Sequence, residues 1–193
     1  MKYQIAKTVQ AKGACILSSV QNVPERSDLR FGISYLSRWP EDVQFTMDPD
    51  FPKDIGLADT LENVSQLLVV SEKLKQALEG IPGALAGNEI LPVKIVNHKK
   101  RTEKAPYFIV HQLDHPPCLD DAKSKGVRNK LLPDQFQIIS KMVLDAGKVP
   151  PALMLFRAKQ YNEVVLMRED LVKQLKPLKL TGLEFHDIDG YAF

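Results

Sequence analysis

The sequence lacks several features that would quickly assign a protein to a functional class. Its 193 residues include only two cysteines, Cys15 and Cys118, too few for the disulfide framework of a small secreted protein. The longest apolar runs, residues 67–70 and 153–156, fall well short of the ~20 residues that cross a bilayer. Residues 1–8 are too polar for the core of a signal peptide. We therefore expect free thiols in a cytoplasmic protein with no membrane anchor.

Neither sign of charge dominates the composition. The chain has 26 basic and 24 acidic side chains and a net charge of +2, which argues against nucleic acid as its main partner. One basic run is the best candidate for such a contact, but Glu103 interrupts it and no aromatic residues are interleaved. We interpret it as the solvated tip of a hairpin. The run consists of Lys94, His98, Lys99, Lys100, Arg101 and Lys104.

Recognisable catalytic motifs are also missing, including glycine-rich phosphate loops and G-x-S-x-G. The nearest approach to a reactive site is the H-x3-H-x2-C spacing of His111, His115 and Cys118. Such residues bind zinc or activate a thiol in other proteins. However, Pro116 and Pro117 prevent a helix from continuing through this segment, and no fourth metal ligand is evident. We favour solvated loop histidines, and we expect no metal and no cofactor.

The sequence does contain a pattern of short strands and capped helices. In residues 21–57, four prolines interrupt the chain and predict a loop-rich lobe around Trp39. Ser71 is a good N-cap for a helix whose apolar stripe ends near Gly80 and Pro82. A second helix begins at Glu169, and residues 136–144 fit neither a helical nor a strand period. The expected strands are 3–6, 14–20, 29–36, 43–47, 90–96, 107–113, 153–158, 164–167 and 183–188.

These elements predict an α+β fold with mostly antiparallel sheet and a few short helices. A loop-rich N-terminal lobe, residues 1–58, would pack on a more regular region, residues 59–193. A short residue pattern also recurs 97 residues further along the chain, and we call this recurrence the internal echo. It is explained by duplication of a strand–helix–strand unit or by a common design for a capped amphipathic helix. The echo relates Val69, Val70, Glu72, Leu74 and Leu78 to Leu166, Met167, Glu169, Leu171 and Leu175.

Two surface features are candidates for partner binding. The loop 114–121 carries Asp114, Asp120 and Asp121, which form either an acidic contact patch or a turn in which aspartate caps its own backbone. Trp39 is either a core anchor for the N-terminal lobe or a binding hot spot. The sequence alone leaves both alternatives open.

An ordered series of short signatures in the chain resembles a family of bacterial immunity proteins that accompany polymorphic and secreted toxins. The resemblance runs from about Asp59 to the C-terminus and includes no catalytic motif. It implies a non-enzymatic inhibitor that is made in the cytosol and binds and blocks a toxin domain, but it identifies no contact residues. The signatures are Val70-Ser71-Glu72, Pro92-Val93, Tyr107 to Val110, Asp120 with Ser124, Phe156-Arg157 and Gly182-Leu183-Glu184-Phe185.

We therefore predict an immunity protein that neutralises a cognate toxin by direct stoichiometric binding. The predicted contact residues are Trp39, Asp114, Asp120 and Asp121. The alternative is a small metal- or thiol-dependent hydrolase that uses the His111, His115 and Cys118 site. The oligomeric state is left open.

Overall fold

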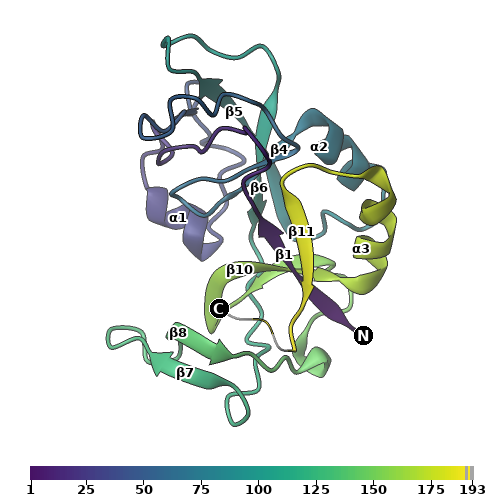
Figure 1. Cartoon of the computed structure of the whole chain (residues 1–193). Coiled ribbons are helices and arrows are strands. Elements are labelled where there is room, and N and C mark those ends of the chain that lie inside the picture. Colours follow the sequence, from purple (N-terminus) through teal and green to yellow (C-terminus); the bar gives the residue numbers. More distant parts are fainter. Residues whose placement is uncertain (190, 192–193) are drawn as a thin grey trace.

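The computed structural model describes residues 1–189 and 191, and its strands form two main sheets and a separate hairpin (Figure 1). The first sheet has the order β2-β5-β6-β4-β3, with strands Gln44–Thr46, Asn88–Val96, Tyr107–Gln112, Leu68–Ser71 and Thr60–Leu61. The second has the order β11-β1-β10-β9, with strands Leu183–Asp187, Tyr3–Thr8, Tyr161–Arg168 and Leu155–Ala158. The hairpin pairs β7 (Lys125–Arg128) with β8 (Phe136–Lys141).

The predicted α+β class is confirmed. Only the β2–β5 pair is parallel among the strand pairs of the described residues. The helices are short: α1 (Arg26–Phe31), α2 (Glu72–Glu79) and α3 (Glu169–Leu175), with 3-10 turns η1 (Ala146–Lys148) and η2 (Lys176–Leu178). Across residues 1–189 and 191, no helix is both long enough and apolar enough to pass through a membrane.

The most regular predictions from the sequence are confirmed. Ser71 caps α2, since its Oγ accepts a hydrogen bond from the Leu74 amide at 3.3 Å. Strands β5 and β6 form the predicted hairpin, with Ile90 opposite Val110. Helix α3 and strand β11 also form as expected, and the ambiguous segment 136–144 contains the strand β8.

Two of the predicted strands are wrong. Residues 29–36 show an alternating apolar pattern, but Phe31 and Ile33 are exposed, and the segment begins inside α1. This helix ends at Gly32, whose φ of 69° places it in the left-handed region. Residues 14–20 form only isolated bridges, because their buried side chains fit into the core of the N-terminal lobe without a continuous ladder.

The two main sheets repeat one topology. In the first, α2 connects β4 to β5, and β6 lies between these two strands and is antiparallel to both. In the second, α3 connects β10 to β11, and β1 takes the equivalent central position. The outer strands β3 and β9 also correspond, because each pairs with the strand that precedes the helix.

The equivalence extends to backbone details that a shared helix design would not require. Gly87 and Gly182 precede β5 and β11, and both have positive φ, 70° and 79°. Each carbonyl accepts a hydrogen bond at 2.9 Å, from the Leu113 amide in one unit and the Val9 amide in the other. These matches favour duplication as the source of the echo, with the central strand of the second unit supplied by the start of the chain.

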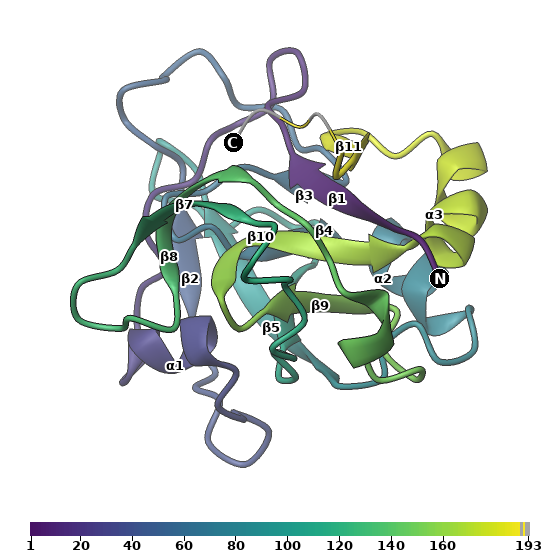
Figure 2. The same ribbon diagram turned by 90° about the horizontal axis from the view of Figure 1, so that it is seen from below.

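The core has three parts. Helices α2 and α3 lie on the same side of the two sheets (Figures 1 and 2). Their buried leucines share one cluster with strand residues of both sheets, and Leu74 and Leu78 of α2 correspond to Leu171 and Leu175 of α3. A second cluster joins the N-terminal lobe to the first sheet, and a third joins the β7–β8 hairpin to the second sheet. Strand β1 thus belongs to the second sheet, and the division at residue 58 stays a prediction.

Candidate functional site

The residues of the predicted thiol or metal site do not form a reactive arrangement. Cys118 is fully buried, and burial raises the pKa of its thiol to about 12, so the thiol is protonated at neutral pH. Among residues 1–189 and 191, no hydrogen bond joins this thiol to His111 or His115. The same residues include no group of three or more His, Cys, Asp or Glu side chains placed to hold a metal ion.

The two histidines occupy different environments. His111 lies on β6 and is buried, so the expectation of a solvated loop histidine is wrong for this residue. Burial lowers its pKa, although a contact of 3.3 Å between its Nδ1 and Glu89 Oε2 opposes that shift. His115 Nε2 lies 3.2 Å from the carbonyl oxygen of Gln112. Burial, and then the nearby Arg157 cation, lower the pKa of His115 to about 4.

Glu89 is a buried carboxylate on β5 that the sequence analysis missed. It accepts hydrogen bonds from the Ser34 hydroxyl and, at 2.9 Å, from the Tyr35 amide, and it also contacts His111. Burial alone would raise its pKa, but these hydrogen bonds together lower it. The serine hydroxyl bonds to the carboxylate rather than to the imidazole, so the order of a catalytic triad is not present. The cluster instead fastens the N-terminal lobe to the first sheet.

Arg157 on β9 is a buried cation, with only 6% of its surface exposed. Its Nε donates to Gln112 Oε1 at 2.9 Å, its Nη2 to the Gln66 carbonyl at 2.7 Å, and its Nη1 to the Asn162 carbonyl. Burial lowers its pKa to about 10, which leaves it charged at neutral pH. Because these acceptors come from both main sheets and the loop before β4, the guanidinium joins the two units.

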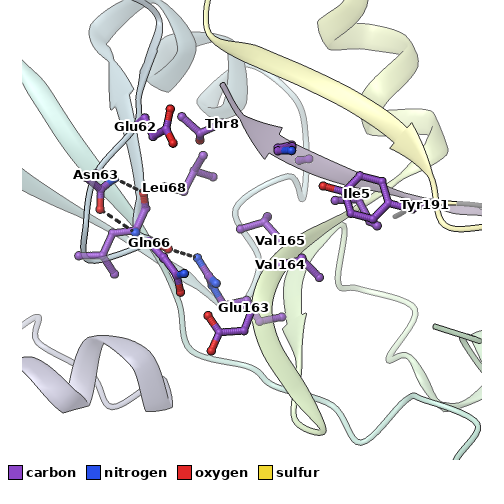
Figure 3. Close-up of a pocket in the computed structure, with 14 residues that line it drawn as sticks. Ile5, Thr8, Glu62, Asn63, Gln66, Leu68, Glu163, Val164, Val165 and Tyr191 are labelled. Atoms are coloured by element: carbon purple, nitrogen blue, oxygen red, sulfur yellow. Dashed lines mark hydrogen bonds between the residues drawn. The ribbon is translucent and has the colours of Figure 1, made fainter. Parts of the chain in front are cut away.

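A cavity of about 240 Å³ lies beside this guanidinium. Figure 3 shows Asn63 and Gln66 on one side of it and Ile5, Val165 and Tyr191 on the other. The Asn63 side chain is engaged by the chain itself. Its Oδ1 accepts from the Leu67 amide at 3.0 Å, and its Nδ2 donates to the Leu67 carbonyl at 2.8 Å. The cavity is therefore a junction between the sheets, and its polar lining includes Asn63 and Arg157, whose side chains the fold itself engages.

Trp39 is half-buried and holds the N-terminal lobe in place. Its indole Nε1 donates to the Pro92 carbonyl at 2.8 Å, and its ring meets Tyr35 edge-on with a centroid distance of 5.2 Å. These contacts match the core-anchor alternative. A contact between Trp39 and a toxin stays a prediction.

Two of the three predicted aspartates are paired with neighbouring cations. Asp120 caps a turn by accepting from the amides of Ala122 and Lys123 at 3.1 Å, and it pairs with the Lys123 ammonium at 2.9 Å. Asp121 pairs with Arg128 at 2.9 Å, whereas Asp114 is exposed. Two of the three charges are thus neutralised locally, and their role in toxin binding stays a prediction.

The basic run lies mainly in the exposed connection between β5 and β6. Asn97 Oδ1 accepts from the amides of Lys99 and Arg101 at 3.0 and 3.1 Å, which fixes a tight turn. Lys99, Lys100 and Arg101 are all exposed, as expected for a solvated hairpin tip.

The β7–β8 hairpin is a surface feature that the sequence analysis did not identify. It projects from the body of the protein below the second sheet in Figure 1. Its exposed large apolar residues lie in a segment that is otherwise polar and rich in turns. The adjacent pair Leu131-Leu132 is the sequence feature that could have indicated an exposed apolar surface here. These exposed residues are Val127, Leu131, Leu132 and Ile138.

The fold thus keeps both thiols and His111 inside and presents apolar side chains on a projecting hairpin, a feature typical of contact surfaces. The sequence profile of the immunity protein family (Imm11) matches residues 4–190. The chain belongs to this family, so the resemblance drawn from the ordered signatures is confirmed, and the match includes the N-terminal lobe. Membership indicates a non-enzymatic role with a toxin as the general kind of partner. A search of curated proteins found no match.

Proposed function

We propose that this protein neutralises a cognate bacterial toxin in the cytoplasm by direct, stoichiometric binding. Its membership of an immunity protein family is the observation that carries the proposal. Inhibitory interfaces of standard size bury about 1,600 Å² in total and depend on a few anchor side chains. The buried Arg157 bonds to acceptors from both halves of the fold and so ties together the elements that carry the surface, and preorganisation of this kind favours affinity.

The rival function is a metal- or thiol-dependent hydrolase. It requires an accessible thiolate or a set of metal ligands, whereas Cys118 is buried and protonated and His111 is held by Glu89. The inhibitor is therefore the better supported function.

The test is a titration of toxin activity. The chain is co-expressed with the toxin domain encoded by the neighbouring reading frame, and the purified proteins are then mixed at defined ratios. An inhibitor restores growth and abolishes toxin activity at one equivalent, whereas an enzyme protects at a small fraction of one equivalent. The Cys118→Ala variant should protect as well as the parent chain. Turnover that disappears with this substitution would overturn the proposal.

A further inference from the structure

The β7–β8 hairpin has one face that the fold uses and one that it leaves open. Phe136 and Ile139 are buried against the second sheet. Val127 and Ile138 lie directly opposite each other across the two strands and are 56% and 58% exposed, and Leu131 in the connecting turn is 90% exposed. Solvent-facing apolar pairs of this kind do not stabilise the monomer by burial and are typical of contact surfaces.

Basic side chains border this apolar face. Lys125 lies opposite Lys141 in the strand register, although like charges in facing positions destabilise a sheet. Lys125, Lys130 and Lys141 are exposed, and within the described part of the chain none of them makes an ion pair. By contrast, Arg128 of the same hairpin is paired with Asp121. The hairpin therefore carries a positive rim that its own fold does not neutralise.

Charge and shape together select the occupant of this face. A second copy of the chain meeting it face to face would bring two positive rims together, which is unfavourable. Single-stranded nucleic acid is held by positive charge together with exposed aromatic rings on which the bases stack. The hairpin offers the charge but not the ring, because its aromatic residue, Phe136, is buried. A protein surface with an apolar centre and an acidic border satisfies both the apolar pair and the lysines.

We propose that the β7–β8 hairpin docks onto the cognate toxin, and that the toxin surface it meets is apolar at its centre and acidic at its border. This inference rests on the proposed function and adds to it the contact face and the chemistry of the partner. Val127, Ile138 and Leu131 supply the buried anchor. Lys125 and Lys141 speed the encounter, and their mutual repulsion is relieved when the acidic border covers them.

The apolar part of the proposal is tested with a matched pair of double variants. Val127→Thr with Ile138→Thr trims the hairpin face while keeping β-branched side chains. Val64→Thr with Ile55→Thr makes the same chemical change at loop residues that are each 62% exposed. Calorimetric titration of the full chain with a catalytically inactivated toxin domain from the neighbouring reading frame should show at least a tenfold loss of affinity for the hairpin variant. The loop variant should stay within twofold of the parent.

The charged part is tested through association rates. Lys125→Glu with Lys141→Glu keeps a like-charged pair across the strands, so the repulsion inside the hairpin persists while the sign presented to the partner reverses. Lys53→Glu with Lys99→Glu makes the same charge change at exposed positions elsewhere. The hairpin reversal should slow association by at least fivefold at low salt, and the gap between the two variants should close as salt is added.

The outcomes separate the two proposals. If the parent chain neither binds nor protects against the toxin domain, the proposed function fails, and this inference fails with it. If the parent binds and both hairpin variants bind equally well, the inference is overturned while the function stands. Faster association of the hairpin charge variant would show a cationic toxin border and overturn the inference. The inference would also be overturned if the parent chain self-associates or binds a generic oligonucleotide, and the hairpin variants lose that binding while their affinity for the toxin is unchanged.

Discussion

Replacing Arg157 with methionine is expected to destabilise the fold without affecting the contact surface. The substitution removes the donors to Gln112 Oε1, the Gln66 carbonyl and the Asn162 carbonyl. A buried acceptor left without a partner costs about 1–3 kcal/mol. The lower end applies here, because the adjoining cavity of about 240 Å³ lets solvent reach these groups. With three acceptors at about 1 kcal/mol each, we expect a net loss of about 3 kcal/mol in the free energy of unfolding.

The assay is urea unfolding followed by circular dichroism at neutral pH, with Arg157→Lys as the control. Lysine keeps the positive charge but lacks the planar fork that reaches three acceptors, so its expected loss is intermediate, about 1–2 kcal/mol. The slope of the unfolding transition should be unchanged in both variants. A loss below about 1 kcal/mol for methionine would refute the reasoning, because the three acceptors would then be satisfied without the guanidinium.

Three further predictions concern other parts of the chain. Gly182→Ala should lower the free energy of unfolding by about 2–3 kcal/mol and Gly87→Ala by about 1 kcal/mol in urea unfolding, although both glycines have positive φ. The Gly182 Cβ would overlap the fixed backbone oxygen of Thr60, whereas the Gly87 Cβ would overlap the ends of the Asp114 and Leu153 side chains, which can shift; equal losses would contradict this. The free energy of unfolding should fall by about 2 kcal/mol as the pH is lowered from 6.5 to 4. The reason is that His115 takes up a proton in the unfolded chain at a higher pH than in the fold, where its pKa is about 4. The His115→Gln variant should flatten this part of the pH profile. Charge reversal of the three aspartates in the loop 114–121 tests the acidic contact patch predicted from the sequence: that prediction requires weaker toxin inhibition in the growth assay, and unchanged inhibition would remove them from the site.

Local sequence patterns were sufficient to predict those elements in which the residues at the ends and the spacing of the apolar residues indicate the same structure. Helix α2 has a serine cap and an apolar stripe, and the β5–β6 hairpin has two apolar runs around a charged turn. The segment 29–36 was predicted to be a strand, and its apolar residues do alternate, but only Leu29 and Tyr35 are buried. Alternation predicts a strand only when one face is covered, and that depends on distant residues.

The candidate site was less predictable for the same reason. Arg157 donates hydrogen bonds to Gln112 and Gln66, which are 45 and 91 positions away in the sequence. No local sequence pattern predicts such a network. The hairpin face could have been suspected from Leu131 and Leu132, but its openness depends on which residues the second sheet covers. Pairing of Asp120 with Lys123 was within reach of sequence reasoning, because the two are only three positions apart.

The placement of β1 also matters for biosynthesis. This strand is synthesised long before its two partners, β10 and β11, and the Gln4 side chain donates to Asp187 from 183 positions away. All strands of the first unit are synthesised before β10, so this unit can form during translation. Strand β1 has no partner until β10 is synthesised, and one of its edges stays open until β11 follows. A chain that stalls before β11 would therefore expose this strand edge to pairing with other chains, so the addition of β11 is the step that protects it from aggregation.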